Sequence, residues 1–160
     1  MHAKLRKFCL EQIKLEYGFV YRSDWHSDLD SLLDLNGIYS AVQKGDFVHE
    51  CHTGAEIYAV GGLRDLQTHA TSWERFHDRY KKPCALWRVY VQRQDQGKGA
   101  GKRIVEKLES RAQQLGYDEI YLHTSWKNPG AVKFWQKMGY TIFCEDKDAE
   151  TTVHMEKRLT

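Results

Sequence analysis

A glycine-rich turn contains the residues of this chain whose types and spacing point most directly to chemistry. The segment 96–102 reads QGKGAGK, between an apolar run over Leu86–Val91 and a stretch whose apolar residues recur at helical spacing. A chain that leaves a strand, turns through glycines and enters a helix directs backbone N–H groups and the positive end of the helix dipole toward one point. The three glycines let that backbone approach a ligand closely. The pattern therefore predicts an anion site, most naturally for phosphate.

The spacing of this turn differs from the two commonest phosphate loops. A dinucleotide fingerprint that began at Gly97 would need a small residue where Lys102 stands. A nucleoside-triphosphate loop would need glycine in place of Gln96 and serine or threonine in place of Arg103. Both patterns are therefore excluded.

The neighbouring residues predict the elements that hold the turn. Leu86–Val91 has the composition of a strand, and Glu119–Thr124 alternates apolar and polar residues as a second strand does. Between them lies a helical stripe of Ile104, Val105, Leu108, Ala112 and Leu115. Gly116 suits the C-terminal cap of that helix.

A second helix is predicted after these strands. Asn128 and Pro129 suit its N-cap and first position, and Gly139 its end. Its apolar face is formed by Ala131, Phe134, Trp135 and Met138. Two strand-like runs, Tyr140–Glu145 and Thr151–Lys157, close the chain.

Two motifs in this half of the chain lie in the right order and separation for one known family. Gln96, Gly99 and Gly101 fill the pattern (Gln/Arg)-x-x-Gly-x-(Gly/Ala), and the second motif is the run IYLHTSWKNPGAVKFWQKMGY. Together they resemble the pyrophosphate loop and the later strand, helix and Gly-aromatic ending of the GNAT acetyltransferases, over Leu86–Lys157. The resemblance implies an α/β fold of the α+β kind, with a central mixed, mostly antiparallel sheet flanked by helices.

The first half of the chain fits the family more loosely. An amphipathic helix is predicted up to Gly18 and a shorter one before the Asn36–Gly37 turn, followed by a hairpin of Phe47–His52 and Glu56–Gly61. The helices are marked by Leu5, Phe8, Cys9 and Ile13, and by Leu29, Leu32, Leu33 and Leu35. The family begins with a strand, which is short or missing here because only residues 1–3 precede the first helix. The sheet edge is then thinner, or is completed by another molecule, as in a homodimer.

The segment 62–86 is longer than the family's usual connection and is predicted to be a helical insertion. Thr71–Glu74 carries a capping-box pattern, and Trp73, Phe76 and Tyr80 share one helical face. Two roles are open for it: packing against the outside of the sheet, or lining the substrate cleft.

Composition limits the function classes. With 160 residues, 41% of them apolar, and no linker or repeat, the chain is predicted to be a single domain over 1–160. A net charge of +2 does not favour nucleic acid as a partner. No apolar run is long enough for a membrane span or a signal core, so a cytoplasmic location is expected. The four cysteines are dispersed, so neither a disulfide framework nor a zinc site is indicated.

The cluster His49, Glu50, Cys51 and His52 contains ligand types that bind metals. On a strand, however, the first and third of these residues would face one side and the second and fourth the other. We therefore predict no metal site here.

The resemblance implies transfer of an acetyl group from acetyl-CoA to a primary amine of a small molecule or peptide, in a ternary complex. The backbone of Tyr90 and Val91 would hold the pantetheine arm, and the N–H group of Val91 would polarise the thioester carbonyl. Asn128 and Trp135 are further predicted cofactor contacts. The predicted pyrophosphate contacts are Gln96, Gly97, Lys98, Gly99, Ala100, Gly101 and Lys102.

Proton transfer is the step for which the family pattern gives the least guidance. Trp135 stands where the family has a tyrosine, and an indole N–H cannot serve as the acid that protonates the thiolate. Tyr90, Tyr121 and Tyr140 are the nearby alternatives, or are packed aromatic residues. As general base we consider His123 first and Glu50 second, each with a purely structural role as the alternative.

Two rival functions stay open at this stage. One is a non-catalytic acyl-CoA-binding module of the same fold, which the absence of the usual tyrosine favours. The other is an acetyltransferase that acts on a macromolecule such as an aminoacyl-tRNA, which would need a basic patch that the net charge does not reveal.

Overall fold

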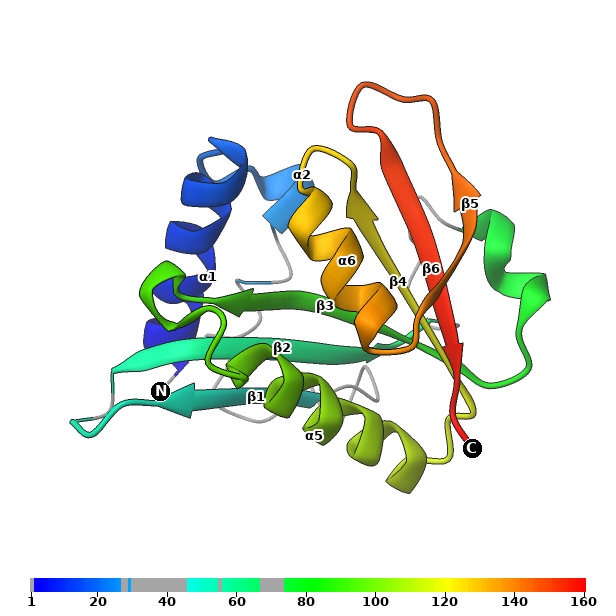
Figure 1. Ribbon diagram of the computed structural model, residues 1–160, viewed down its shortest axis with the longest axis horizontal. Coiled ribbons are helices and arrows are strands. Elements are labelled where there is room, and N and C mark those ends of the chain that lie inside the picture. The colour runs from blue at the N-terminus through cyan, green and yellow to red at the C-terminus, as the bar shows by residue number, and fades with distance from the viewer. Residues whose placement is uncertain (1, 27–28, 30–45, 55, 67–73) are drawn as a thin grey trace.

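The computed structural model describes residues 2–26, 29, 46–54, 56–66 and 74–160 (Figure 1). Within these ranges six strands form one sheet in the order β1-β2-β3-β4-β6-β5. The strands are β1 Asp46–Cys51, β2 Ile57–Asp65, β3 Pro83–Val91, β4 Glu119–Ser125, β5 Thr141–Glu145 and β6 Thr152–Arg158. The helices are α1 His2–Tyr17, α2 Ser23–His26, α5 Ala100–Gln114 and α6 Pro129–Lys137, with short 3-10 turns η1 Glu74–Arg79 and η2 Arg93–Asp95.

The sheet is mixed and mostly antiparallel, as predicted. Only β3 and β4 run parallel, and the other neighbouring strands pair antiparallel. Among the described residues no strand precedes α1, which agrees with the expectation of a short or missing first strand. The predicted hairpin is present as β1 and β2, although β2 continues to Asp65.

Helices cover the two faces of the sheet differently. Helices α5 and α6 pack on one face, which is the near side in Figure 1, through a core that includes Leu63, Leu86 and Leu122. Helix α1 packs on the other face of β2 and β3, against Val60 and Tyr90. The side chains of a strand alternate between faces, so each strand residue belongs to one of these two environments.

The buried stripe of α5 follows the sequence prediction except at its end. Ile104, Val105, Leu108 and Ala112 are buried, but Leu115 is 41% exposed because the helix has ended by then. Gly116 adopts a φ of +84°, and the next N–H group, from Tyr117, bonds the Ala112 carbonyl at 3.0 Å. This is the glycine-capped helix end that the sequence predicts.

Helix α6 begins and ends where the sequence predicts. The Asn128 side chain accepts a hydrogen bond from the Ala131 N–H at 3.1 Å, Pro129 is the first helical residue, and Gly139 has a φ of +88°. Trp135 is buried as expected, and Val132, which lies next to the predicted stripe, is fully buried.

The predicted insertion 62–86 is too long. Residues 62–65 continue β2 and residues 83–86 begin β3, because the two strands pair from Leu63 with Leu86 to Asp65 with Cys84. The described part of the connection contains the 3-10 turn η1 and no α-helix. Phe76 and Tyr80 pack in a third core cluster on the sheet, and the capping-box residues 71–73, Trp73 included, lie outside the described ranges.

The predicted N-terminal helix is present as α1. Its four marker residues, Leu5, Phe8, Cys9 and Ile13, are all buried, and the helix ends at Tyr17 before Gly18, whose φ is +71°. Leu29 is fully buried beside α1. The other markers of the predicted second helix, Leu32, Leu33 and Leu35, and the turn at 36–37 lie outside the described residues.

Candidate functional site

Strands β3 and β4 separate partway along their length and leave a gap in the sheet. Their pairing consists of Pro83 with Glu119, Cys84 with Ile120, and Ala85 with Tyr121. Beyond Ala85, β3 continues to Val91 while β4 turns away, and their arrowheads point in different directions in Figure 1. A strand that loses its neighbour keeps backbone N–H and C=O groups that can bond a ligand instead.

A β-bulge in β3 accompanies this separation. Pairing with β2 shifts between Val60 and Gly62, so that Gly61 faces both Arg88 and Val89. Arg88 adopts a φ of +52°, which is costly for a residue other than glycine. Gly61 allows α5 to lie close to the bulge, because a Cβ there would be only 2.6 Å from Ile104 Cγ2.

The register of β3 decides which backbone groups face the gap. The Gln92 N–H donates to the Tyr58 carbonyl of β2 at 2.7 Å, and Tyr90 pairs with Val60. Since the bonding direction alternates along an antiparallel strand, the main chain of Tyr90 faces β2 and that of Val91 faces away from it. The predicted role of Val91 therefore fits this register, and a backbone contact between Tyr90 and a ligand does not.

The glycine turn presents backbone N–H groups at the start of α5. Gly97 and Gly99 have φ angles of +76° and +82°, the left-handed region that favours glycine. The backbone bonds found within the described chain include none donated by residues 97–102, whereas the Arg103 N–H donates to the Gly99 carbonyl at 3.1 Å. Among the described residues these N–H groups have no backbone acceptor, and they lie at the positive end of the helix, where an anion can bind.

Gly101 has a different role from the one the sequence predicts. It lies inside α5, and an added Cβ would be 3.2 Å from the Phe134 ring of α6. Its small size therefore lets the two helices approach, while only Gly97 and Gly99 shape the turn.

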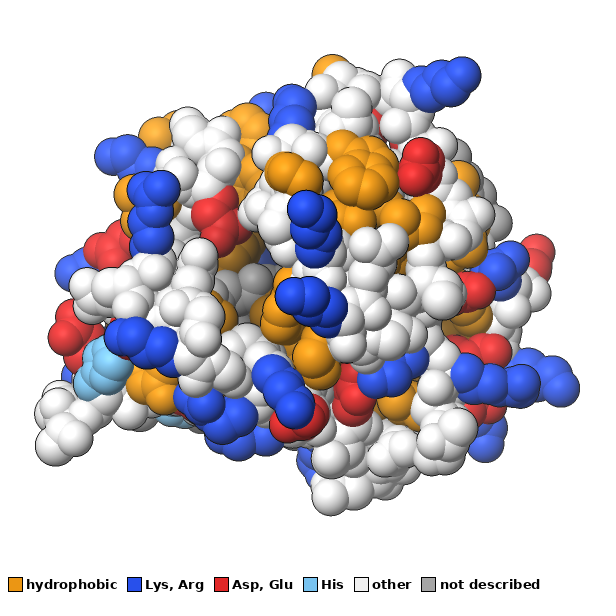
Figure 2. Space-filling model, in the orientation of Figure 1, with side chains coloured by type: hydrophobic (Ala, Val, Ile, Leu, Met, Phe, Trp, Pro, Cys, Tyr) orange, Lys and Arg blue, Asp and Glu red, His pale blue; other side chains and the backbone are white. Residues whose placement is uncertain are grey.

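Figure 2 shows that the near face is hollowed between α6 and the segment after β3, and that Lys and Arg side chains lie around this hollow.

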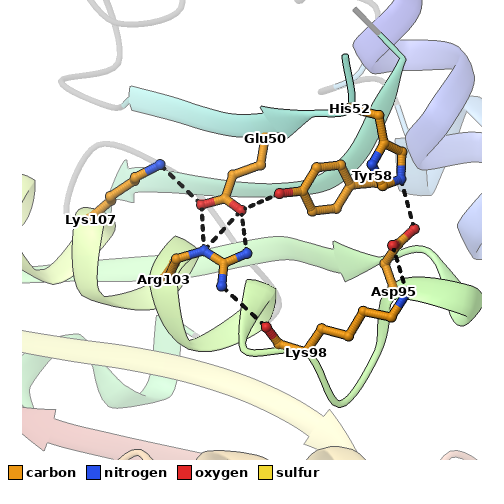
Figure 3. A network of polar contacts seen from close by, with 7 residues as sticks. All are labelled: Glu50, His52, Tyr58, Asp95, Lys98, Arg103 and Lys107. Atoms are coloured by element: carbon orange, nitrogen blue, oxygen red, sulfur yellow. Dashed lines mark hydrogen bonds and ion pairs between the residues drawn. The ribbon is translucent and has the colours of Figure 1, made fainter. Parts of the chain in front are cut away.

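A network of charged residues fixes the turn from the side of β1 (Figure 3). The Arg103 guanidinium donates to both oxygens of Glu50, the shortest contact being 2.9 Å, and also to the Lys98 carbonyl at 3.2 Å. Lys107 and the Tyr58 hydroxyl bond the same Glu50 carboxylate at 3.1 and 2.8 Å. Arg103 therefore connects β1 to the backbone of the glycine turn.

Asp95 forms the second half of this network. It lies 3.1 Å from His52 Nε2 and 3.4 Å from Lys98 Nζ, and the His52 ring stacks on Tyr58 with centroids 4.3 Å apart. Burial opposes ionisation of Asp95, but the contacts with His52 and Lys98 outweigh it and lower the pKa of the carboxyl. No sequence pattern indicates this role of Asp95, because its partners come from β1 and the turn.

Glu50 is not placed as a general base. The Glu50 side chain is only 10% exposed and lies on the α5 face of the sheet. On β4, Ile120 and Leu122 pack against α5 and α6, so His123 lies on the opposite face. Hydrogen bonds from Arg103, and further ones from Tyr58 and Lys107, lower the pKa of Glu50 to about 2. The carboxylate is therefore a structural anchor, and this environment contradicts its predicted role as the second candidate base.

His123 lies on β4 beyond the last residue paired with β3, directly opposite His154 of β6. Desolvation by the surrounding protein lowers the pKa of His123 to about 4, although the residue as a whole is exposed, and the charges of His154, Arg64 and Arg88 lower it further. At neutral pH the ring is therefore uncharged and can accept a proton, but it is a weak base.

The three tyrosines considered as acids are all buried. Tyr90 packs against α1, and burial raises its pKa. Tyr121 bonds His154 Nδ1 at 2.8 Å, and His154 Nε2 in turn contacts Asp146 at 2.8 Å. Tyr140 donates to Glu109 at 3.0 Å, and burial raises its pKa. Their environments fit packed aromatic residues.

The two predicted ligand contacts on α6 have structural roles. The Asn128 side chain caps the helix, and Trp135 is buried between Phe134 and Tyr140 in edge-to-face contacts. In the metal-ligand cluster, Glu50 lies on the α5 face while Cys51 packs with the α1 cluster, as strand alternation predicts. Within the described ranges no group of three or more His, Cys, Asp or Glu side chains is arranged to hold a metal.

Comparison with known proteins shows the family to which this chain belongs. The sequence model of the acetyltransferase (GNAT) family matches residues 16–140. The chain therefore belongs to the acetyltransferase (GNAT) family. An uncharacterised N-acetyltransferase of Bacillus subtilis, YdgE, is 36% identical over 63 residues, which span 39% of this chain and only about a third, 35%, of that relative.

Solved structures share the fold at low sequence identity. A GNAT-family acetyltransferase from Staphylococcus aureus Mu50 aligns with a TM-score of 0.75 at 19% identity, over 99% of this chain and 93% of its own. The PaiA N-acetyltransferase of Thermoplasma acidophilum, solved with coenzyme A, aligns with a TM-score of 0.66 at 19% identity, over 98% and 92%. YncA of Salmonella typhimurium, a putative acetyltransferase solved with acetyl-CoA, aligns with a TM-score of 0.70 at 14% identity, over 100% and 91%.

No helix within the described part of the chain is both long enough and apolar enough to span a membrane.

Proposed function

We propose that this protein transfers the acetyl group of acetyl-CoA to a primary amine of a small molecule or peptide, directly within a ternary complex. The observation that carries the proposal is the turn at 97–102, whose N–H groups have no backbone acceptor among the described residues, together with the gap between β3 and β4. A helix start of this kind suits a pyrophosphate, and the unpaired strand edge suits an extended pantetheine arm. The names of the relatives, two of them solved with coenzyme A or acetyl-CoA, support the same donor.

The gap positions the reacting groups in this scheme. The pyrophosphate binds on the α5 face, the thioester enters the gap, and the amine approaches from the α1 face, where His123 lies. The Val91 N–H would donate to the thioester oxygen and stabilise the negative charge that develops there. Holding both substrates together supplies much of the rate enhancement.

The amine must lose a proton before it attacks. We assign the acceptance of this proton to His123, which lies beside the gap and whose ring is uncharged at neutral pH. Its weak basicity means that the acceptor's own ionisation controls much of the rate. Trp135 takes no part in proton transfer, because its indole is packed in the core. The departing thiolate would then take its proton from solvent.

A turnover assay tests the proposal. We expect release of the CoA thiol that depends on an amine, measured with acetyl-CoA against a panel of small amines and peptides. Tight binding of acetyl-CoA by calorimetry without turnover on any acceptor would instead favour the non-catalytic acyl-CoA-binding module, which the buried Trp135 makes a genuine rival. Failure to bind acetyl-CoA would overturn both.

We further propose that the whole chain acts as one domain in the cytoplasm. The four cysteines are unpaired with one another, as expected in a reducing compartment. Fractionation of cells followed by immunodetection would test the location.

A further inference from the structure

Two arginines and a tryptophan lie together on the acceptor side of the sheet. The Arg64 guanidinium carbon of β2 is 4.0 Å from the centroid of the Trp87 ring, and that of Arg88 is 6.0 Å from the same ring. Trp87 packs with the α1 cluster, so the group faces α1 and not α5. It therefore lies on the opposite face from the glycine turn, where the proposed donor binds.

Strand register and the bulge explain why these residues meet. Gly62 pairs with Trp87, and Arg64 is two residues further along β2 on the same face. The Arg64 guanidinium therefore reaches back along this face to the Trp87 ring. Arg88 is the extra residue of the bulge, with its φ of +52°, which places a second cation beside the first.

The arginines also act on the residue proposed to face the acceptor. Besides burial, the charges of His154, Arg64 and Arg88 lower the pKa of His123, so both arginines are within electrostatic range of its ring. Arg88 influences Tyr17 at the end of α1 in the same way. The cluster of Arg64, Trp87 and Arg88 therefore adjoins the position where an amine would meet the thioester.

This chemistry suits a carboxylate. A guanidinium offers five N–H donors in its plane, and two of them match the two oxygens of a carboxylate. We propose that the acceptor is a small amine that also carries a carboxylate, which Arg64 and Arg88 bind while the amino group reaches the gap beside His123. This inference rests on the proposed acetyltransferase function and names its substrate class.

Matched pairs of acceptors test the substrate class. Amino carboxylates are compared with alkylamines of the same chain length and similar amine pKa, for example 4-aminobutanoate with n-butylamine, and α-amino acids with their primary amides across pH. We expect kcat/KM to be at least about 10-fold higher for the carboxylate member. Equal or higher kcat/KM for the neutral amines would overturn the inference while leaving the acetyltransferase function intact.

Variants assign the effect to the cluster. Arg64→Gln and Arg88→Gln should each raise KM for amino carboxylates about 10-fold or more, change KM for neutral amines little, and leave the Kd of acetyl-CoA unchanged. Arg158→Gln, at an exposed site near the end of β6, is the matched control. Arg64→Lys and Arg88→Lys retain the charge and should recover part of the loss. An equal rise in KM for charged and neutral acceptors would overturn the assignment.

A binding measurement separates this inference from the proposed function. Thermal shifts with amino carboxylates and their neutral partners, in the presence of CoA, should favour the carboxylates even without turnover. If no acceptor is turned over but the carboxylates still stabilise the wild type and not Arg64→Gln, the catalytic proposal fails and the binding class stands. If neither member of any pair stabilises the protein, the inference is overturned.

Discussion

At the scale of single residues, Glu50 shows how a carboxylate that sequence patterns suggest as a base becomes an anchor. It holds Arg103 and Lys107 of α5, and Arg103 in turn bonds the Lys98 carbonyl of the glycine turn. A base needs a free lone pair and a pKa near the working pH, whereas this carboxylate is occupied by three donors. Its contribution is to stability and to the shape of the turn.

Replacing Glu50 with glutamine should lower the free energy of unfolding by about 1–2 kcal/mol at pH 7. The folded pKa of about 2 lies below the usual value, so the ionised carboxylate stabilises the fold above about pH 4.5. That contribution is lost as the pH falls toward 2. Urea unfolding should therefore show a smaller difference between Glu50→Gln and wild type at pH 3 than at pH 7.

The matched control is Glu106→Gln, since Glu106 pairs with Lys102 on the exposed side of the same helix at 3.7 Å. Exposed pairs of this kind contribute little, so we expect a change below about 0.5 kcal/mol. A loss in Glu50→Gln that does not depend on pH would contradict the ionic origin.

His123 leads to a prediction about pH and rate. Because its pKa is lowered to about 4, the ring is already neutral above pH 5 and cannot cause an inflection near pH 6.5. We expect kcat/KM to rise with pH up to the amine's own pKa, and His123→Ala to lower kcat without changing the shape of that profile above pH 5. An inflection between pH 6 and 7 that disappears in His123→Ala would show that the histidine titrates normally.

At the scale of elements, the junction of β3, the glycine turn and α5 decides whether a phosphate can bind. Gly99 ends the turn in the left-handed region, and an added Cβ would also lie 3.2 Å from Arg103 Nη1. A side chain here would disturb both the direction of the N–H groups and the guanidinium that holds the turn. The effect should appear in ligand binding more than in the fold.

Gly99→Ala should therefore weaken acetyl-CoA binding about 10-fold or more, while costing about 1 kcal/mol of stability. Gly116→Ala is a matched control, because Gly116 has a nearly identical φ of +84° and nothing within 4 Å of its added Cβ. It should lose similar stability with no change in the Kd of acetyl-CoA, measured by calorimetry. An unchanged Kd in Gly99→Ala would contradict the pyrophosphate assignment.

At the scale of the whole molecule, the gap between β3 and β4 divides the sheet into two parts. The part formed by β1, β2 and β3 carries α1 on one face and α5 on the other, and β4, β6 and β5 form the second part beyond the gap. A ligand that lies in the gap would bridge the two parts. Its binding energy should then add to the stability of the entire fold.

Acetyl-CoA should raise the melting temperature in a concentration-dependent way. At 100 times its Kd it contributes about 2.7 kcal/mol, which for a chain of this size corresponds to a rise of about 5–10 °C. Differential scanning fluorimetry over a range of acetyl-CoA concentrations measures this, with the Gly99→Ala variant as control. A shift that is equally large in that variant would place the ligand elsewhere.

Sequence alone determined the parts of this protein that depend on neighbours along the chain. The cap of Asn128, the glycine-ended helices at Gly116 and Gly139, the buried stripe of α5 and the turn at Gly97 and Gly99 all follow from residues that are close together in the sequence. Local backbone sterics and side-chain periodicity act over that distance, which is why their outcome can be predicted.

Only the tertiary structure decided features whose causes are far apart in the sequence. Glu50 meets Arg103 across 53 residues, the Phe134 ring fills the space that Gly101 leaves, and the charges that lower the pKa of His123 come from other strands. The length of β2 and the start of β3 likewise depend on their mutual pairing, so the connection between them is shorter than the predicted insertion. Electrostatic and packing energies depend on distance in space, so these roles became visible only once the chain was folded.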